Sequence, residues 1–517
     1  MFVRTGFRRV RPTVRDGATR AVVLGLGPAG RAAAHRAAAR GWEVLAIDPA
    51  GGAGSMPPTV GVWTRQLPGW LPDAAVAARF RPLVIDADGR ERRLDEYAIL
   101  DTGVLGGLGG FRTLRGRGVS SSSVRFAWGG NAPGGGDCDR GFRARVRDRL
   151  RARRARRLSS ATVGPGVVVL DESGAGDCGG AYWDGSAGPA EPGILPDGWD
   201  SPDVLVDASP TSYPLPVLQL AVGHVVPGTA IPERHRRPVL MDFTEPPSAA
   251  AAAEEPEAPA TFSYRLPLGD GRWLIEETIL AAHVVDDAHC ARLTAHLRRA
   301  QAARLAALGV DPTSAVDEEL VRFHLGPARV PSHRPRTALG ERLRSIPVGR
   351  GVYLDLSGLV PWSGRGTPGV ADFGASGGWM HPATGYSVGA SLADVDRVLD
   401  RLIARADATP RGGRLLLLLR RRGLAALLAF DAPATREFFT CFLRLPAPFI
   451  RAYLTGGSAL ATLGVMASVA VPLLRRSPRT LGLLLSGSVR RLPRSGIVHV
   501  PAAPSPGEPG PSTPVEP

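Results

Sequence analysis

Three glycines near the start of the chain have the spacing that a backbone needs to approach a phosphate group. Gly25, Gly27 and Gly30 match Gly-x-Gly-x-x-Gly, between an apolar run at residues 21–24 and an alanine-rich stretch at residues 32–39. In such a strand–turn–helix unit, the glycines permit the tight turn, the approach of a pyrophosphate and close helix–strand packing. Asp48 ends a second apolar run, where an acid binds ribose hydroxyls. The pattern predicts an FAD or NAD site, and the acid argues against an NADP 2′-phosphate there.

Two adjacent carboxylic acids, Glu276 and Glu277, could supply a proton. They close a strand predicted at residues 273–278, so their side chains point to opposite faces. One can face a cavity while the other is solvated or paired. A carboxylic acid held in an apolar pocket has a raised pKa and acts as a general acid near neutral pH. The alternative is a pair of surface glutamates at a strand edge.

A glycine-rich loop at residues 374–386 surrounds His381. Glycines such as Gly374 and Gly385 let a backbone pass close to a cofactor ring or a pyrophosphate. His381 could relay a proton or hydrogen-bond the ring, and Thr384, Gly385 and Tyr386 would line the same region. Equally, His381 could simply fix the loop.

The elements that must position these residues follow from the hydrophobic pattern. Apolar runs between turn residues predict two sets of strands: one near the start of the chain, and a later one that forms an antiparallel sheet. Stretches with a helical period follow each set. The predicted strands are residues 21–24, 43–47, 167–170, 204–206, 218–226, 239–243, 262–266 and 273–278, and the helices are residues 32–39, 287–308, 390–406, 414–430 and 436–445.

The composition excludes several classes of function. The net charge is +15, and all 63 basic residues are arginines spread along the chain, which favours a GC-rich coding bias over a nucleic-acid surface. The basic stretch at residues 140–157 is interpreted as a solvated helix. The four cysteines form no CxxC pair, so neither zinc nor a disulfide framework is expected, and the setting is cytoplasmic. The arginine-rich start lacks the apolar core of a secretory signal.

Several stretches, in order, resemble the lycopene β-cyclase family of carotenoid cyclases. The Glu-Glu-Thr motif and the His-Pro-Ala-Thr-Gly-Tyr loop are the most specific. The likeness covers most of the chain outside residues 103–200. The matching stretches are Val60–Trp63, Tyr97 with Leu100 and Asp101, Gln219–Gly223, Leu240–Phe243, Leu274–Thr278, Gly374–Tyr386, Arg436–Phe439 and Leu445 with Pro446.

The resemblance implies a redox-neutral cyclisation of lycopene, or of a related acyclic carotenoid, to β-ionone rings. It assigns the general acid to Glu276 and places Glu277 and His381 in the catalytic set. It implies reduced FAD as the active cofactor and NADPH as its reductant. Gly25, Gly27, Gly30, Asp48, Gly374, Thr384 and Gly385 would bind the FAD.

The expected fold is α/β: a Rossmann-type FAD-binding domain with an inserted antiparallel-sheet substrate domain and a C-terminal helical region. The FAD-binding domain takes residues 19–203, irregular over about 103–200, and residues 331–408. The substrate domain takes residues 204–330 and the membrane-proximal helices residues 409–490. Residues 1–18 and 491–517 are expected to be disordered tails, and residues 249–259 a mobile loop.

An uncharged stretch at residues 455–474 is long enough to span a bilayer. Because it holds three glycines and Pro472, we expect a buried or interfacial helix and a peripheral membrane association. Arg475, Arg476 and Arg479 could meet anionic lipid heads. Two alternatives to cyclisation stay open: an FAD-dependent monooxygenase or prenyl-chain reductase, and an inactive flavin-binding protein.

Overall fold

The structure is a computed structural model, and it describes part of the chain. The described residues are 18–48, 51–52, 56, 59–115, 199, 202–209, 217–245, 259–325, 346–349, 352–354, 369–375, 377–406, 408–410 and 413–489. Outside them lie the predicted tails (apart from residue 18), the irregular segment from residue 116 to 198, with its expected helix at 140–157 and strand at 167–170, and the expected loop over residues 249–258.

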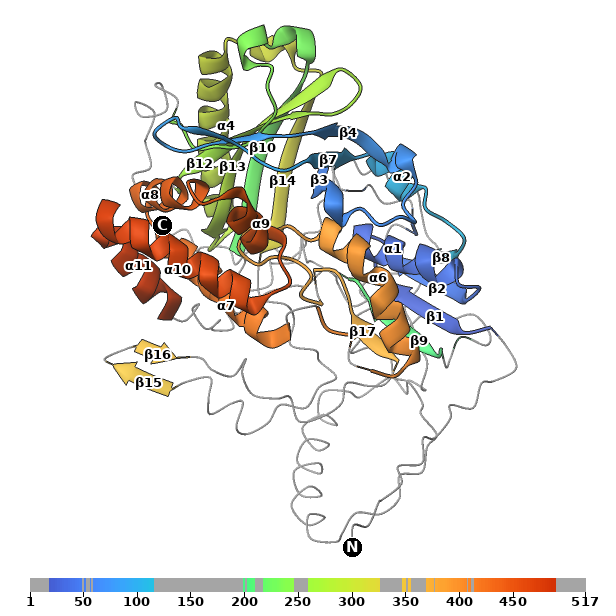
Figure 1. Ribbon diagram of the computed structural model, residues 1–517. Helices are drawn as coiled ribbons and strands as arrows, with labels where there is room; N and C mark the ends of the chain where they lie inside the picture. The colour runs from blue at the N-terminus through green and yellow to red at the C-terminus, as the bar shows by residue number, and fades with distance from the viewer. Residues whose placement is uncertain are drawn as a thin grey trace, which may run out of the picture.

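A parallel sheet carries the glycine-rich loop (Figure 1). Its strand order is β17-β9-β1-β2-β8, and every pairing is parallel. Parallel strands need crossover connections, and α1 links β1 to β2. The elements are β1 (Arg20–Leu24), α1 (Pro28–Ala38), β2 (Glu43–Asp48), β8 (Arg112–Arg115), β9 (Val204–Asp207), β17 (Val370–Asp372) and α6 (Val388–Ile403).

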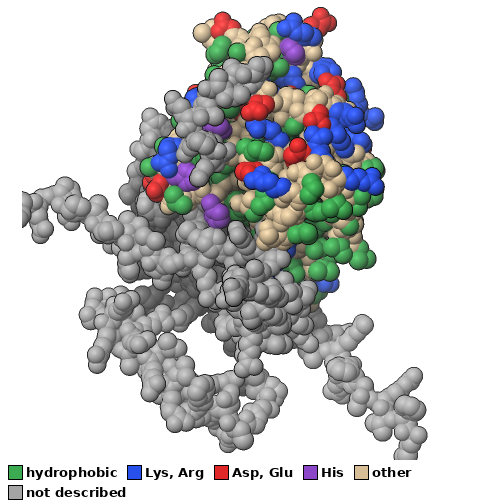
Figure 2. Space-filling model, turned by 90° about the vertical axis from the view of Figure 1, so that its left-hand side faces the viewer, with side chains coloured by type: hydrophobic (Ala, Val, Ile, Leu, Met, Phe, Trp, Pro, Cys, Tyr) green, Lys and Arg blue, Asp and Glu red, His purple; other side chains and the backbone are tan. Residues whose placement is uncertain are grey.

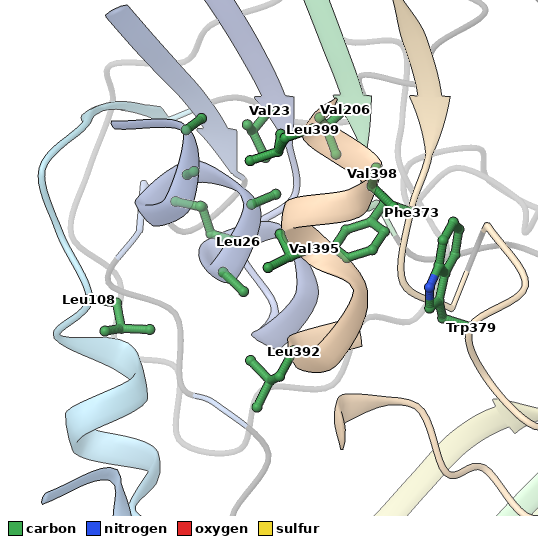
Figure 3. Packing of buried hydrophobic residues seen from close by; sticks show 14 of the residues in the cluster. Val23, Leu26, Leu108, Val206, Phe373, Trp379, Leu392, Val395, Val398 and Leu399 are labelled. Atoms are coloured by element: carbon green, nitrogen blue, oxygen red, sulfur yellow. The ribbon is translucent and has the colours of Figure 1, made fainter. Parts of the chain in front are cut away.

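The helices α1 and α6 cover one face of this sheet side by side (Figure 3). The face of α1 that packs on the strands is almost entirely alanine, which lets helix and sheet approach closely. On α6, Leu392, Val395 and Leu399 recur at helical spacing and are buried in the same core. This core fixes the loop that follows β1 and the loop that follows β17.

A seven-stranded sheet forms the second layer, in the order β14-β10-β13-β12-β11-β5-β6. All neighbours are antiparallel except β11 and β5. Strands β5 and β6 come from the stretch that the sequence assigned to the FAD-binding domain. The elements are β5 (Leu83–Ile85), β6 (Glu91–Arg93), β10 (Val217–Pro227), β11 (Val239–Asp242), β12 (Thr261–Pro267), β13 (Arg272–His283) and β14 (Asp317–Leu325).

The strand with the two glutamates is longer than predicted. Because Ile279, Leu280 and Ala282 are buried and β13 stays paired with β10 up to His283, Glu276 and Glu277 lie in the middle of β13 and not at its end. Helix α4 (Asp287–Leu308) covers one face of this sheet and matches its predicted bounds.

Five C-terminal helices pack on the opposite face of the seven-stranded sheet. Phe243 stacks on Phe262 of β12 at 5.0 Å and on Phe439 of α8 at 4.4 Å, between ring centroids. The helices are α7 (Gly413–Leu427), α8 (Ala432–Leu443), α9 (Ala447–Thr455), α10 (Ala459–Arg476) and α11 (Pro478–Val489). The sequence predicted α7, α8 and α10 within a few residues.

Two smaller sheets complete the described fold. A three-stranded antiparallel sheet has the order β3-β7-β4, and β15 pairs with β16. The fold is thus mixed α/β with parallel and antiparallel sheets and C-terminal helices, as expected. The remaining elements are β3 (Val60–Trp63), β4 (Val76–Phe80), β7 (Tyr97–Leu100), β15 (Ile346–Gly349), β16 (Val352–Leu354), α2 (Thr102–Gly106) and the 3₁₀ turns Thr64–Gln66, Asp73–Ala75, Gly228–Ala230, Glu233–His235 and Pro312–Ser314.

Candidate active site

The glycine-rich loop has the backbone that the sequence predicts for a dinucleotide site. Gly25 has φ +80°, a conformation that side chains rarely adopt. A Cβ on Gly30 would lie 1.9 Å from the carbonyl oxygen of Gly25, so only glycine lets α1 begin against the turn. A Cβ on Gly27 would meet no atom within 4 Å among the described residues. The N-terminus of α1 is therefore accessible beside Gly27, where its backbone N–H groups suit an anion.

Asp48 ends β2 next to this loop. Its Oδ2 accepts a hydrogen bond from the backbone N–H of Leu26 at 2.8 Å. The buried Arg31, in the first turn of α1, donates to the carbonyl of Gly52 at 2.6 Å. These contacts hold the predicted ribose-binding acid against the turn between β1 and α1.

The loop after β17 meets the same helix end. Gly374 has φ +67°, and a Cβ there would lie 2.7 Å from the Cβ of Ala29. The N–H of Phe373 donates to the carbonyl of Asp207 at 2.7 Å, which ties this loop to the end of β9. Gly25, Gly27, Gly30, Asp48 and Gly374 are thus brought together, and this glycine-lined helix end fits an FAD pyrophosphate.

Glu276 is buried on the face of the seven-stranded sheet that turns away from α4. Its side chain is 8% exposed, and its Oε1 accepts a hydrogen bond from the hydroxyl of Thr278 at 3.0 Å. The motif's threonine therefore lies two residues along the same strand and the same face. Burial, together with the negative charge of the nearby Glu319 carboxyl, raises the pKa of Glu276 to about 8, against the opposing hydrogen bond from Thr278. Glu276 therefore holds a proton at neutral pH.

Strand register places Glu319 and Glu276 on either side of a glycine. Gly223 of β10 pairs with Glu276 of β13 on one side and with Glu319 of β14 on the other. Glu319 is 7% exposed, and its Oε1 accepts a hydrogen bond from the hydroxyl of Thr59 at 2.7 Å. Glu319 could not be recognised from the sequence, because in Asp317-Glu-Glu-Leu320 it is indistinguishable from surface charge.

Glu277 points to the opposite face, toward α4. Its Oε2 pairs with Arg304 Nε at 3.2 Å, and its Oε1 accepts a hydrogen bond from the hydroxyl of Thr261 at 2.6 Å. Arg304 also faces Asp242, which pairs with Arg265 at 3.1 Å. All four charged side chains are buried. The structure thus separates Glu277 from Glu276 and joins it to the acid of the Leu240–Phe243 motif in an ionic network under α4.

His381 is buried in its loop, on the side of the C-terminal helices. Its ring lies 5.0 Å from the ring of Tyr453 on α9, between centroids, and its Nδ1 accepts a hydrogen bond from the N–H of Ala383 at 3.3 Å. Burial lowers the pKa of His381 well below 6.5, and the positive charge of Arg420 lowers it further. The imidazole is therefore neutral, with Nε2 carrying the proton.

The rest of the loop lies on the sheet face that carries Glu276. Gly385 has φ +74°, and a Cβ there would lie 2.5 Å from the ring of Phe323 on β14 and 3.1 Å from Oε1 of Gln219 on β10. The N–H groups of Thr384 and Gly385 both donate to the carbonyl of His381, at 3.2 and 2.9 Å. The positive φ of Gly385 allows the chain to make this tight turn.

Three tyrosines connect the loop to the glutamate: Tyr97 is buried, and Tyr264 and Tyr386 are partly buried. Tyr386 belongs to the loop residues expected to line the site, whereas no pattern in the sequence marks Tyr264. Tyr264 of β12 pairs directly with Glu276, and Tyr386 of the loop lies beside both Tyr264 and Tyr97. Burial raises the pKa of Tyr386 to about 12, while its contacts with Tyr97 and Tyr264 oppose the shift. The phenols are therefore neutral, and a polar cluster extends from the loop to the acid.

An apolar pocket opens between the C-terminal helices close to this cluster. Tyr453, which touches His381, forms part of its wall. The pocket is also lined by Leu427, Phe438, Phe442, Val465 and Val469. The site as a whole thus combines a protonated carboxyl, neutral phenols and imidazole, and an adjacent apolar pocket.

Comparison with known proteins finds a relative that matches over most of this chain, together with broad likenesses to solved structures. A protein of Deinococcus radiodurans described as an uncharacterized carotenoid cyclase is 26% identical over 452 residues, which cover 82% of this chain and 83% of the relative. A geranylgeranyl bacteriochlorophyll reductase-like structure from Thermoplasma acidophilum covers 91% of this chain and 100% of its own, with 12% identity and a TM-score of 0.45. A Klebsiella pneumoniae protein complexed with FAD and uric acid covers 92% and 99%, with 12% identity and a TM-score of 0.36.

The family model described as lycopene cyclase protein matches residues 202–323 and 331–474. These ranges hold both the strand of Glu276 and the loop of His381, together with β9, β10, most of β14 and most of the C-terminal helices. They make up more than half of the 517 residues. The chain therefore belongs to the lycopene cyclase family.

Proposed function

We propose that this protein is a carotenoid cyclase that forms β-ionone end rings from lycopene, with Glu276 as the general acid. The observation that carries the proposal is the state of Glu276: buried, hydrogen-bonded by Thr278 and protonated at neutral pH. Protonation of an unactivated alkene needs a carboxylic acid that keeps its proton in a dry pocket.

Glu276 starts the reaction in this proposal by protonating C2 of the terminal double bond. The O–H bond of Glu276 breaks, a C–H bond forms at C2, and a carbocation develops at C1. The C5–C6 double bond attacks C1 and closes the ring. This leaves the positive charge on C5. The C6 proton then passes to solvent, which gives the C5–C6 double bond of the β ring, and solvent returns a proton to Glu276. The product is therefore an isomer of the substrate, and no electrons are gained or lost.

Reduced FAD is the cofactor that we propose, with NADPH as the source of its electrons. Gly25, Gly27, Gly30 and Gly374 would hold the pyrophosphate at the N-terminus of α1, and Asp48 would take the ribose. Thr384 and Gly385 would line the flavin side. When bound, an anionic reduced flavin supplies negative charge that stabilises a nearby cation.

The other buried groups of the site have supporting roles. Tyr264 and Tyr386 are partly buried against the core of the C-terminal helices and limit the access of water to the side of Glu276. Burial raises the pKa of both phenols, so they are neutral. His381, neutral and hydrogen-bonded within its own loop, holds the turn that brings Tyr386 to Tyr264. Its Nε2, which has no hydrogen-bond partner among the described residues, remains a candidate proton donor.

The carotenoid would enter from a membrane surface along the C-terminal helices. Buried residues of α10 recur at helical spacing, whereas Leu460 is 79% exposed, Leu474 60% and Leu463 52%. Figure 2 views the side of the molecule with these helices and shows hydrophobic side chains gathered next to arginines. In the described part of the chain, only α10 has the length and apolarity of a membrane-crossing helix. We propose that it lies on the bilayer surface, because one of its faces is packed against the other helices.

The mass of the product tests this function. The purified protein is incubated with lycopene, FAD and NADPH, in H₂O and in D₂O. Cyclisation gives a product with the mass of lycopene in H₂O, and with one solvent deuterium per ring in D₂O. Addition of oxygen would identify a monooxygenase, addition of hydrogen a prenyl-chain reductase, and no turnover with bound flavin an inactive flavin-binding protein. Any of these outcomes overturns the proposal.

A further inference from the structure

The acid site contains a second buried carboxyl that the proposed mechanism has not used. On one face of the sheet, four residues lie in a row across four strands: Glu319 on β14, Gly223 on β10, Glu276 on β13 and Tyr264 on β12. Directly paired residues in an antiparallel sheet share a face. Glu319 and Glu276 are therefore two strands apart, about 10 Å between backbones, with no side chain between them.

Gly223 is the residue that makes this arrangement possible. A Cβ there would lie 3.2 Å from the Cβ of Glu276 and 2.7 Å from Cδ1 of Leu274. Any side chain at this position would stand between the two carboxyls. The glycine that ends the Gln219–Gly223 stretch therefore leaves the two acids facing each other.

Glu319 is held by only one of its oxygens. Thr59, directly before β3, donates to Oε1, whereas the buried Oε2 has no hydrogen-bond partner among the described residues. A buried carboxyl oxygen without a partner is costly unless it carries a proton or faces one. The oxygen without a partner, Oε2, therefore belongs to the residue that lies directly beside Gly223 and the space above it.

We propose that Glu319 is a positioning residue for the acid: across the gap left by Gly223, it keeps the proton on Glu276. Two carboxyls that share a buried site do not both ionise readily, so the pair retains one proton through neutral pH. The other groups that bear on Glu276 are Glu277 and Thr278 of its own strand and Tyr264 of β12. Asp317 adds negative charge beside Glu319. In cyclisation, Glu319 would ensure that Glu276 starts each turnover protonated. This catalytic role of Glu319 rests on the proposed function.

The direct test is an infrared titration of Glu276, which needs no substrate. The C=O band of the protonated Glu276 is assigned by its loss in Glu276→Gln, and its titration midpoint is compared among variants. Glu319→Gln keeps the shape and lets Thr59 still donate, and we expect the midpoint to fall by about one pH unit or more. Glu318→Gln, which removes an exposed neighbour paired with Arg298, is the matched control and leaves the midpoint unchanged.

A second variant changes the ionisation of Glu319 without removing either carboxyl. Thr59→Val removes the donor that stabilises ionised Glu319, so Glu319 repels the charge of Glu276 less and the midpoint falls as well. This variant leaves both carboxyls in place, so it covers the case in which Glu319→Gln does not fold. An unchanged midpoint in whichever of the two variants folds overturns the inference.

The pH profile of cyclisation gives the catalytic readout. In Glu319→Gln the alkaline limb moves to lower pH by the same amount, while the rate on the acidic plateau stays within about threefold of the parent. A purely structural role would lower the rate equally at every pH, and that result contradicts the inference. If the parent protein cyclises no carotenoid, the proposed function fails, and the infrared midpoints still decide the pairing of Glu319 with Glu276.

Discussion

At the residue scale, the two glutamates of one motif have opposite surroundings. Glu276 lies among a hydroxyl, a phenol and a second carboxyl, whereas Glu277 is locked to Arg304. The period of a β-strand accounts for this difference, because neighbouring side chains point to opposite faces. The acid and the residue that stabilises the sheet can therefore be adjacent in sequence and separate in function.

The raised pKa of Glu276 makes stability depend on pH. Between about 4.5 and about 8, folded Glu276 holds a proton that unfolded Glu276 has lost. The free energy of unfolding therefore falls as pH rises through this window, by at most about 1.4 kcal/mol per pH unit. In urea unfolding at pH 5 and pH 9, we expect Glu276→Gln to gain stability relative to the parent at pH 9. Parallel pH profiles for the two proteins would contradict this.

Removing the carboxylate that pairs with the buried Arg304 should lower the stability of the protein. Glu277→Gln leaves Arg304 without its closest carboxylate, and we expect it to lower the free energy of unfolding by about 3 kcal/mol. The control is Glu245→Gln, which breaks the exposed pair with Arg436 and should cost less than about 1 kcal/mol. Urea denaturation measures both. If folded Glu277→Gln fully retains FAD but loses cyclisation, Glu277 has a direct catalytic role instead.

At the element scale, local pattern predicts the elements well and their partners poorly. The unit of β1, α1 and β2 and the helix α4 could be predicted because their signals are contiguous: glycine spacing and apolar periods. The pairing of Glu276 with Gly223 and Glu319 could not, since it depends on the register of strands far apart in the chain. For the same reason, the sequence did not predict that β5 and β6 join the seven-stranded sheet.

Two glycines of the loop after β1 should respond differently to alanine. Gly30→Ala places a Cβ against the carbonyl of Gly25, so we expect it to destabilise the whole protein, with a lower thermal midpoint even without FAD. Gly27→Ala meets no described atom within 4 Å, so it should fold normally but bind FAD at least about tenfold more weakly, because the methyl obstructs the pyrophosphate. Fluorescence titration with FAD and thermal unfolding separate these effects. Unchanged FAD affinity in Gly27→Ala would contradict the proposed site.

At the scale of the whole molecule, the proposed acid lies on the sheet face that the C-terminal helices cover, and two other parts of the fold contribute to the proposed reaction. The parallel sheet offers the dinucleotide loop, and the C-terminal helices offer an apolar pocket and an exposed apolar face. The arginines expected to meet lipid are partly engaged in the protein: Arg476 pairs with Asp88 and Glu437, and Arg479 with Asp431. Membrane contact in this account therefore depends mainly on the leucines of α10.

Charge on the exposed face of α10 should weaken binding to lipid. We expect the double variant Leu463→Glu with Leu474→Glu to bind anionic phospholipid vesicles at least about tenfold less than the parent, because both side chains are exposed and apolar. Val285→Glu, on an exposed site after β13, is the control and should bind like the parent. Vesicle co-sedimentation measures the difference. Equal binding of all three proteins would place the membrane contact elsewhere.

The central claim is that Glu276 is the acid of a redox-neutral cyclisation. The most direct measurement compares the parent protein and Glu276→Gln, each with lycopene, FAD and NADPH, and follows the cyclic product and the bound flavin in the same sample. We expect the parent to form a product isomeric with lycopene, and the variant to lose at least about a thousandfold in rate with unchanged FAD content. Cyclisation by Glu276→Gln at the parent rate would contradict it.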